Sequence, residues 1–398
     1  MSNANEPAGA FAYMFVVPWD TYFVGGVNGV VLNLARTMRA ETALRPIVAV
    51  NDWSARSFQA NAEGVRYRFS FLGALNLIGL LKGLLRLPLC LWRLNRFLRA
   101  EGVRVVNFHY VGDSALSIAL LKWLRLFDGK LILSVHGADV VRPQGWVARF
   151  TYATIFDAAD VVVAVSKGLA ARVSDQFGVP LSRVSIIYNG VDHSIFNPDA
   201  ASHRGGSTEL PASYFVSVGR YIPRKDHACL LQAFALLSGV HRELSLCIAG
   251  DDGPELEPLR QEAVRLGLAS RVRLLQSLSP AQVAHLLARA VACVQPSLAE
   301  GFPLTALEAA ATGTPLVVSS IPGHDEIVKD QVSGLLFPAR DIAACAAAME
   351  RILDSPQFGK QMAHTLRAQA LELFTWSRCL SAYLGAIGMT PTGSALRR

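Results

Sequence analysis

The 398-residue chain is poor in cysteine, in charged residues and in long apolar runs. Its six cysteines stand far apart and form no CxxC pair, so neither a zinc site nor a disulfide framework is expected. Buried, reduced thiols of a cytosolic protein are the simpler expectation. No stretch reaches the ~18–20 apolar residues of a membrane-spanning helix. The polar start MSNANEPAGA lacks the basic region of a signal peptide.

The sequence also lacks the motifs of several common enzyme classes. There is no GxSxG nucleophile elbow and no GxxxxGK[ST] phosphate loop, which disfavours an α/β-hydrolase and an ordinary NTPase. No DxD pair is available to hold a divalent metal on a sugar diphosphate, and we interpret DD at 251–252 as part of a turn. Val24 interrupts a GxGxxG pattern, so a nicotinamide-dependent dehydrogenase is disfavoured.

Apolar residues make up 52% of the chain and charged residues 17%, which is typical of a core-forming protein. Short apolar runs alternate with amphipathic helical stretches along the whole length, a rhythm that predicts parallel sheets covered on both faces. The stretch 196–213, rich in Pro, Gly, Ser and Asp, is predicted to be a linker. The fold class is therefore α/β, with one domain over 1–195 and a second that begins at 214.

Polar residues follow several of the predicted strands. His136 follows LILSV, Ser166 follows VVVAV, Arg220 follows FVSVG, Gly250 follows LCIA and Ser297 follows CVQP. Because ligands bind at the carboxyl ends of strands in open parallel sheets, these residues are candidates for a site.

The stretch EGFPLTALEAAATGTPLVV carries two acids, Glu300 and Glu308, around the start of an Ala-rich helix. Pro303 suits the first helical turn and Gly313 the helix end. The free amides near Leu304 and Thr305 then offer an anion site suited to a phosphate. Carboxylates accept hydrogen bonds from the hydroxyls of sugars or ribose. The alternative is a solvated surface glutamate plus a capping glutamate.

The stretch VGRYIPRKDH places Arg220, Arg224 and Lys225 in a loop before a helix that begins near Asp226. These cations could neutralise a diphosphate, Arg as a fork and Lys as a point charge. A solvated basic loop is the alternative.

Two weaker candidates lie in the N-terminal half. Gly25 and Gly26 would let the backbone approach an anion closely, although a turn before a core helix explains them equally well. His136 could donate to a sugar hydroxyl, or it could be structural. Asp139 could orient His136 or cap the following turn.

The formal charge of +7 is compatible with anionic partners of several kinds. The Leu-rich segment 72–102 carries Lys82 and four arginines before its first acid, Glu101. Such a basic apolar stretch can lie in a membrane interface. The alternative is a buried helix pair broken at Pro88.

These blocks together resemble the GT-B retaining glycosyltransferases, specifically glycosyltransferase family 4. EGFPLTALEAAATGTPLVVS and the following GHDEIV are similar to the family's E-x7-E signature. IIYNGVD, VGRYIPRKD, AGDDGP and the early GGVNGV match other family blocks in order and rough spacing, so the resemblance spans nearly the whole chain. It implies two Rossmann-like domains facing across a cleft.

The resemblance also implies roles for the C-terminal residues, over a donor-binding domain at 214–373. Glu300 would contact hydroxyls of the donor sugar and Glu308 the ribose. Arg220 and Lys225 would hold the diphosphate with the amides of Leu304 and Thr305.

Further donor-binding residues are expected from the same resemblance. Gly250 is one of them, and Gly25 and Gly26 would approach the phosphate or sugar from the N-terminal, acceptor-side domain. His136 would contact the sugar. Residues 374–398 would form a helix that crosses back to the N-terminal domain, followed by a tail.

Two residues depart from the family pattern. Ser277 stands near the base-binding loop where glycine is common, which leaves the base open, and Asp226 replaces a frequent glycine after the lysine.

The resemblance predicts a metal-independent retaining glycosyltransferase without a cofactor. It would move a sugar from a nucleotide-diphosphate sugar to a glycan or lipid-linked acceptor in polysaccharide or glycoconjugate biosynthesis. We expect a cytoplasmic protein, peripheral on the inner face of a membrane through 72–102, with no nucleic-acid partner. The alternative is a non-catalytic nucleotide-sugar-binding paralogue that acts as a scaffold.

Overall fold

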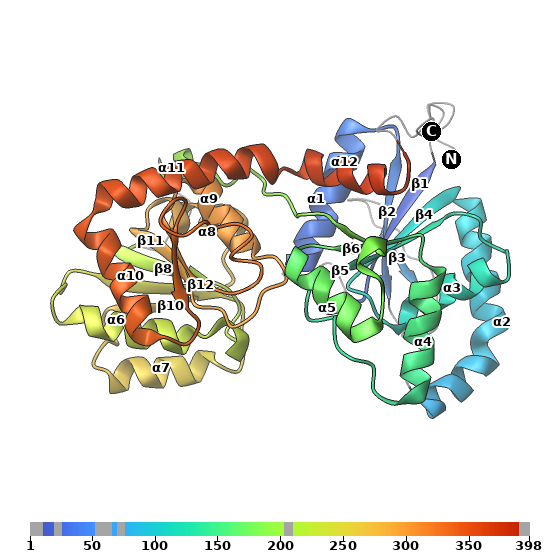
Figure 1. Cartoon of the computed structure of the whole chain (residues 1–398), viewed down its shortest axis with the longest axis horizontal. Helices are drawn as coiled ribbons and strands as arrows, with labels where there is room; N and C mark the ends of the chain where they lie inside the picture. Colours follow the sequence, from blue (N-terminus) through green and yellow to red (C-terminus); the bar gives the residue numbers. More distant parts are fainter. Residues whose placement is uncertain (1–10, 20–25, 52–65, 70–75, 203–209, 390–398) are drawn as a thin grey trace. The chain divides into compact units, whose positions relative to one another are not determined.

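The computed structural model of the 398-residue chain describes residues 11–19, 26–51, 66–69, 76–202 and 210–389. Contacts divide the chain into two compact units. Unit 1 comprises Met1–Asn189 with Trp376–Arg398, and unit 2 comprises Gly190–Thr375. Each unit is built on its own parallel β-sheet flanked by helices (Figure 1).

The sheet of unit 1 has seven strands in the order β3-β2-β1-β4-β5-β6-β7. All described neighbours pair in parallel. Its strands are β1 (Ala12–Val17), β2 (Arg45–Asn51), β3 (Arg66–Phe69), β4 (Val103–His109), β5 (Lys130–Val135), β6 (Val161–Ala164) and β7 (Val184–Ile186).

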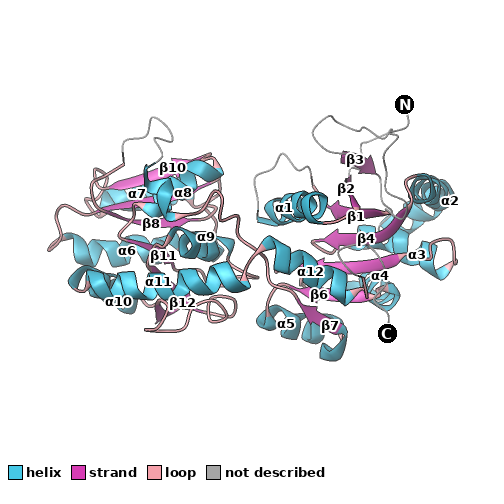
Figure 2. Cartoon of the chain, turned by 90° about the horizontal axis from the view of Figure 1, so that it is seen from above, coloured by secondary structure: helices cyan, strands magenta, loops and turns pink. Residues whose placement is uncertain are grey.

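Helices cover both faces of this sheet. In the views of Figures 1 and 2, α1, α5 and α12 lie on one face and α2, α3 and α4 on the other. The helices of the unit are α1 (Gly26–Glu41), α2 (Leu77–Ala100), α3 (Leu116–Trp123), α4 (Gly145–Ala158), α5 (Lys167–Phe177) and α12 (Trp376–Ala386), with 3-10 turns η1 (Asp113–Ala115) and η2 (Leu181–Arg183).

The sheet of unit 2 has six parallel strands in the order β10-β9-β8-β11-β12-β13. Its strands are β8 (Tyr214–Val218), β9 (Ser245–Gly250), β10 (Val272–Gln276), β11 (Ala292–Gln295), β12 (Leu316–Ser320) and β13 (Leu335–Pro338). Its helices are α6 (His227–Ser238), α7 (Leu256–Arg265), α8 (Pro280–Ala288), α9 (Leu304–Thr312), α10 (Ile342–Asp354) and α11 (Pro356–Leu373), with η3 (Pro198–Ser202) and η4 (Pro223–Lys225).

Continuous apolar strands explain the layered cores. All six residues of β1 are buried, as a strand covered on both faces requires. In unit 2, residues of α6, α10 and the central strands, among them Phe234, Met349 and Val294, form one buried cluster. The α/β prediction of parallel sheets covered on both faces is confirmed.

Three local features differ from the sequence-based expectations. Strand β3 was not expected, because RYRF contains no apolar run; it lies at the sheet edge. The segment predicted to be an irregular linker contains the 3-10 turn η3. Ala200 of this turn is buried, and its carbonyl oxygen lies 2.9 Å from Nδ1 of His285.

The alternative interpretation of this segment, a buried helix pair broken at Pro88, was wrong, because α2 is one helix with Pro88 inside it. Pro88 is exposed, so water can satisfy the carbonyl that loses its amide partner. Leu91, Leu94, Phe97 and Leu98 anchor the C-terminal half of α2 in the core. Among the described residues, no helix has the length and hydrophobicity needed to span a membrane.

Candidate active site

The loop that follows β8 is shaped by two glycines of the neighbouring β9–α7 segment. A Cβ on Gly250 would lie 2.0 Å from the carbonyl oxygen of Gly219, and one on Gly253 would lie 2.1 Å from that of Tyr221. The buried Tyr221 hydroxyl donates to the carbonyl of Ile248 at 2.7 Å. The loop therefore rests directly on the end of β9, and the predicted donor-binding residue Gly250 serves this close packing.

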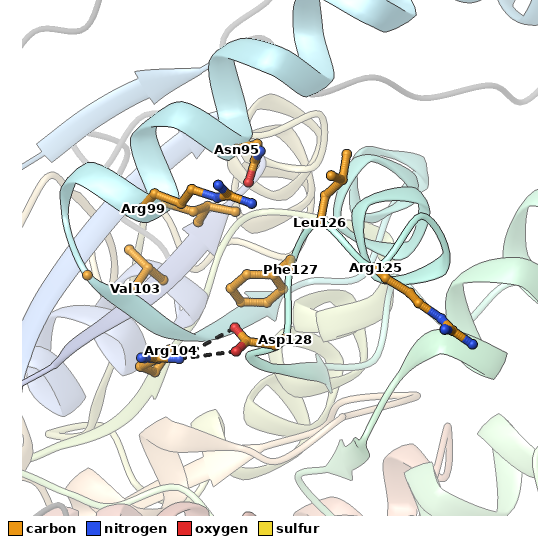
Figure 3. Close-up of a pocket in the computed structure, with 10 residues that line it drawn as sticks. Asn95, Arg99, Val103, Arg104, Arg125, Leu126, Phe127 and Asp128 are labelled. Atoms are coloured by element: carbon orange, nitrogen blue, oxygen red, sulfur yellow. Dashed lines mark hydrogen bonds and ion pairs between the residues drawn. The ribbon is translucent and has the colours of Figure 1, made fainter.

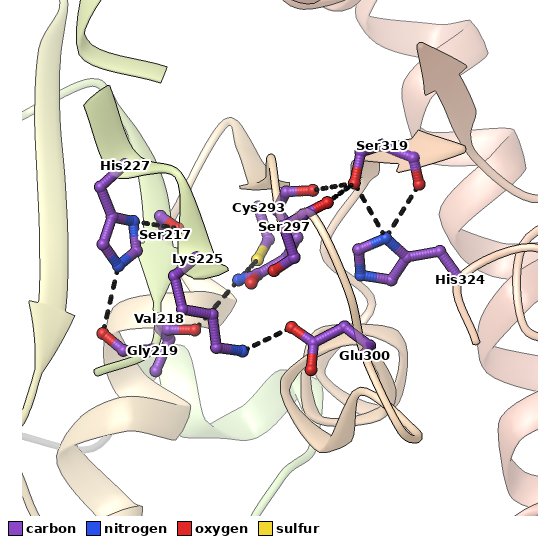
Figure 4. Close-up of polar contacts among 11 residues, drawn as sticks. Ser217, Val218, Gly219, Lys225, His227, Cys293, Ser297, Glu300, Ser319 and His324 are labelled. Atoms are coloured by element: carbon purple, nitrogen blue, oxygen red, sulfur yellow. Dashed lines mark hydrogen bonds and ion pairs between the residues drawn. The ribbon is translucent and has the colours of Figure 1, made fainter. Parts of the chain in front are cut away.

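Lys225 lies at the end of this loop and reaches the segment that follows β11. Its Nζ lies 2.7 Å from Oε1 of Glu300 (Figure 4). The Lys225 and Glu300 side chains are only 14% and 8% exposed. A Cβ on Gly219 would lie 3.0 Å from Cε of Lys225, so the glycine leaves room for the lysine stem. The amide of Leu298 also donates to the carbonyl of Arg224 at 2.8 Å, which ties the two loops together.

The charge of Glu300 is stabilised despite its burial. Burial acts to raise the pKa of Glu300, but Lys225 and His324 nearby, together with the hydrogen bond from Lys225, lower it to about 2. Glu300 is therefore a carboxylate throughout the physiological range, acceptor-only, with one oxygen engaged by Lys225.

Glu308 has the opposite electrostatic character. It lies in α9, and burial raises its pKa to about 7, against a lowering effect of Lys225. The two predicted acids thus differ in protonation at neutral pH, although both stand near the same lysine. Neighbouring acids whose pKa values are shifted in opposite directions are common at functional sites.

Helix α9 begins directly after Pro303, which is its N-cap rather than part of its first turn. The carbonyl of Pro303 accepts from the amides of Ala306 and Leu307 at 3.0 and 3.4 Å. The amides of Leu304 and Thr305 precede these donors and have no acceptor within the helix. The helix therefore begins with free backbone amides where the sequence predicted them, and it ends as predicted at Gly313, in the left-handed conformation with φ 75°.

Arg220 makes no side-chain hydrogen bond or ion pair with the described residues of this cluster. The structure therefore brings Lys225 and Glu300 into contact and places Glu308 within the electrostatic reach of Lys225. The amides of Leu304 and Thr305 lie at the start of the helix that carries Glu308. Arg220 is an exposed cation on the same loop as Lys225.

His136 belongs to unit 1, where it follows β5. Its Nε2 lies 3.0 Å from Nδ1 of His109, at the end of β4. Burial lowers the pKa of His136 to about 4. Asp139 does not touch the ring of His136, because its carboxylate accepts from the backbone amides of Val111, His136 and Gly137 at 2.9, 2.9 and 2.7 Å. Asp139 therefore holds the loop backbone.

Of the two early glycines, Gly25 lies outside the described residues, and Gly26 is the exposed first residue of α1. The sequence patterns did not single out His109 and His324. His109 ends a predicted strand, NFH, in the same way as the residues that were singled out, so this signal was available. His324 lies in the turn after β12, with Nδ1 2.9 Å from the carbonyl of Ser319, and only the tertiary structure places it beside Glu300.

Within the parts of the chain that the structure describes, no group of three His, Cys, Asp or Glu side chains is arranged to hold a metal ion.

A pocket of about 380 Å³ lies elsewhere in unit 1 (Figure 3). Asn95 and Arg99 of α2 line it with Phe127, and Arg104 pairs with Asp128 at its rim at 3.3 Å. It adjoins the amino-terminal ends of β4 and β5, whereas His136 follows the carboxyl end of β5.

Comparisons with known proteins agree with this architecture. Residues 203–370 match the family described as Glycosyl transferases group 1, and residues 24–195 match the one described as Glycosyltransferase Family 4. A glycogen synthase of Mycobacterium tuberculosis is 30% identical over 287 residues, which cover 70% of this chain and 67% of that protein. A D-inositol 3-phosphate glycosyltransferase of a Nocardioides species is 29% identical over 88% of this chain and 82% of its own length.

Solved structures share the fold. A sucrose-phosphate synthase from Thermosynechococcus elongatus superposes with a TM-score of 0.72 at 23% identity, over 94% of this chain and 98% of that one. The Anabaena protein Alr3699/HepE, crystallised with UDP and glucose, gives a TM-score of 0.73 at 18% identity over the same shares. The chain belongs to the glycosyltransferases of GT-B fold, with two Rossmann-like domains.

Proposed function

We propose that this glycosyltransferase moves a sugar from a nucleoside-diphosphate sugar to a hydroxyl acceptor, with retention of anomeric configuration. The observation that carries the proposal is the Lys225–Glu300 ion pair, which precedes in the fold the free backbone amides at the N-terminus of α9. A partly buried ammonium and free helix amides suit a diphosphate. The ionised Glu300 suits donor-sugar hydroxyls, and Glu308 suits the ribose.

The relatives support a nucleotide sugar as donor. Structures of the Anabaena protein contain UDP or UDP-glucose, and a TarM variant of S. aureus was crystallised with UDP and α-GlcNAc-glycerol. The names of a lipopolysaccharide outer core galactosyltransferase and of the glycogen synthase support a glycan or lipid-linked acceptor in polysaccharide or glycoconjugate biosynthesis.

In the proposed reaction, the bond between the anomeric carbon and the β-phosphate oxygen breaks. The acceptor oxygen bonds to the anomeric carbon on the same face, and its proton passes to the departing phosphate. Lys225, Arg220 and the amides of Leu304 and Thr305 would stabilise the charge that develops on the leaving group. One such preorganised donor is worth ~3–4 kcal/mol. Side-chain cations would supply this charge without a metal ion or another cofactor.

Thermal-shift measurements with UDP, GDP and ADP test donor binding. A ligand at ~100 times its Kd stabilises the folded state by about 2.7 kcal/mol. Arg220→Ala should lower kcat by about tenfold, which corresponds to ~1.4 kcal/mol of transition-state stabilisation. Unchanged turnover of a folded variant would remove Arg220 from the proposal.

Transfer assays with a panel of nucleotide sugars then separate an enzyme from a binding scaffold. NMR of the product reports its anomeric configuration, and inversion would reject the mechanism. Activity abolished by EDTA and restored by a divalent cation would reject metal independence.

We also propose that helix α2 holds the protein on an anionic membrane surface, with the acceptor at or near the inner face of the membrane. The helix carries a stripe of exposed apolar side chains at helical spacing, and Leu85 is 88% exposed. The stripe comprises Leu77, Ile78, Leu81, Leu85, Leu89 and Trp92. An exposed apolar patch of this kind marks an interaction site.

Cations accompany this stripe. Arg86, Arg93 and Arg96 are exposed on α2, and the Arg96 guanidinium lies over the Trp92 ring at 5.5 Å. Arg99 lines the pocket of Figure 3 at the C-terminal end of the helix. A basic face with Trp and Leu is typical of helices that lie in the membrane interface.

Flotation with vesicles containing phosphatidylglycerol or only phosphatidylcholine tests this proposal. Leu85→Glu should reduce binding to the anionic vesicles, and salt should weaken binding of the wild type. Leu236→Glu, at an exposed leucine of α6, is the matched control. Equal binding of both variants and the wild type would contradict membrane docking through α2.

A further inference from the structure

A buried histidine, His109, lies against His136, the residue of unit 1 for which the family resemblance implies a contact with the sugar. His109 has no solvent exposure, and its ring stacks on that of His136 with centroids 5.1 Å apart. On its other sides it contacts the rings of Phe15 and Tyr383, at 5.7 and 5.9 Å. Nδ1 of His109 and Nε2 of His136 are 3.0 Å apart, a hydrogen-bond distance.

This hydrogen bond restricts the protons of both rings. Burial lowers the pKa of His109 well below its ordinary value, with a further contribution from His136, and burial also lowers that of His136. Both rings are therefore neutral, and each carries one proton. Because one proton must lie between the two facing nitrogens, the tautomer of one ring determines the tautomer of the other.

The second ring nitrogen of His109, Nε2, shows which of the two histidines donates the hydrogen bond between them. Nε2 of His109 is buried and has no hydrogen-bond partner in the described part of the chain. If His136 donated to His109, the proton of His109 would stand on this Nε2 as an unpaired, buried N–H, a group that is rare in folded proteins. If His109 donates, Nε2 carries only a lone pair, and His136 keeps its proton on Nδ1.

We propose that His109 is a positioning residue that fixes His136 in its Nδ1–H tautomer. His136 then offers a hydrogen-bond donor from Nδ1, and a hydroxyl oxygen of the donor sugar is a suitable acceptor. The inference rests on the proposed sugar transfer and on the contact with the donor sugar that the family resemblance implies for His136. His109 itself is buried and acts only through His136.

A polar network anchors this part of the sheet. The Tyr383 hydroxyl, from α12, donates to Oγ of Ser134 at 3.0 Å. The Ser134 hydroxyl in turn donates to Oδ1 of Asn107 at 2.8 Å. Nδ2 of Asn107 donates to the Tyr13 hydroxyl at 3.0 Å. These paired groups hold the strand ends next to His109 in register, so that its ring has little freedom to turn away from His136.

Long-range ¹H–¹⁵N spectra of the full-length, ¹⁵N-histidine-labelled protein test the tautomers directly. The chain has nine histidines, and the variants His109→Asn and His136→Asn assign the two relevant signals. We expect the Nδ1–H pattern for both rings. A proton on Nε2 of His136 would overturn the proposal. This readout does not depend on catalysis, so it remains decisive if the proposed function fails.

Kinetics of two His109 variants test the consequence. His109→Phe keeps an aromatic ring but removes the donor, and we expect kcat/KM for the nucleotide sugar to fall about tenfold, the effect of ~1.4 kcal/mol. His109→Asn places an amide donor near the position of Nδ1 and should restore most of the rate. Affinity for the free nucleoside diphosphate, UDP, GDP or ADP, should be unchanged in both, because it lacks the sugar.

The controls separate positioning from folding. Equal rates for His109→Phe and the wild type would overturn the proposal. Equal losses in both variants, together with lower melting temperatures, would show a purely structural role and would also overturn it. Absence of sugar transfer in the wild type itself would instead reject the proposed function.

Discussion

Replacing Lys225 by Met tests the buried ion pair of the proposed donor site most directly. The substitution keeps an unbranched side chain but removes the cation that lies 2.7 Å from Glu300. Glu300 would then be a buried carboxylate without its charged partner. We expect a large loss of stability at neutral pH, because an unpaired buried charge is costly.

The expected magnitude follows from the proton equilibrium of Glu300. Its pKa of about 2 compares with an ordinary value of 4.5. Since a tenfold change in this equilibrium is worth ~1.4 kcal/mol, the folded state gains about 3 kcal/mol from keeping Glu300 ionised. Breaking a buried pair costs ~3–5 kcal/mol, so we expect Lys225→Met to lower the free energy of unfolding by about 3 kcal/mol or more.

The pH dependence provides a second check. A lowered carboxyl pKa contributes stability that is present above the ordinary value of 4.5 and is lost as the pH falls toward 2. The difference between the wild type and Lys225→Met should therefore be large at pH 7 and smaller near pH 3. In the double variant with Glu300→Gln, most of the neutral-pH loss should be recovered, because position 300 then carries no buried charge.

The chain offers an internal control for this assay. All six tryptophans lie outside residues 190–375, so tryptophan fluorescence follows unit 1, whereas far-UV circular dichroism follows both units. In urea unfolding, Lys225→Met should shift the dichroism transition of unit 2. Lys360→Met, at an exposed lysine of α11, should change stability by less than ~0.5 kcal/mol. Equal stability of the two variants at pH 7 would refute the reasoning.

Three further predictions concern residues of unit 2. Burial raises the pKa of Glu308 to about 7, so the wild type should lose about 3 kcal/mol of stability between pH 4.5 and 7. Denaturation curves recorded at several pH values should show no such loss in Glu308→Gln. If the stability of the wild type and of the variant changed in parallel with pH, the prediction would be contradicted. Gly250→Ala should cost about 3 kcal/mol, because its Cβ would collide with the Gly219 carbonyl, and an unchanged melting temperature would contradict this packing. Ser277 has φ 55°, so Ser277→Gly should raise stability by ~1 kcal/mol. Calorimetry checks it, and a lower melting temperature would count against backbone strain.

The backbone φ angles explain what is unusual about the two residues that depart from the family pattern. Ser277 and Asp226 stand where the family resemblance implies frequent glycines, and both have positive φ, 55° and 48°. The sequence showed where the substitutions stand. Only the backbone conformation shows that each side chain occupies a position that favours glycine.

The sequence by itself determined the local elements. Continuous apolar runs predicted nearly all strands, because strands buried on both faces need apolar side chains throughout. Pro303, the alanines and Gly313 predicted α9 and its open start. The strand β3, in which arginines alternate with aromatic residues, was missed because its sequence contains no apolar run that would predict a strand.

The tertiary structure decided which strand ends meet. β11 pairs with β8, so the loops that follow them place Glu300 against Lys225, 75 residues apart in the chain. β4 pairs with β5, which places His109 against His136. Strand order depends on how helices pack over the whole sheet, a property of many distant contacts, and no local pattern in the sequence encodes it.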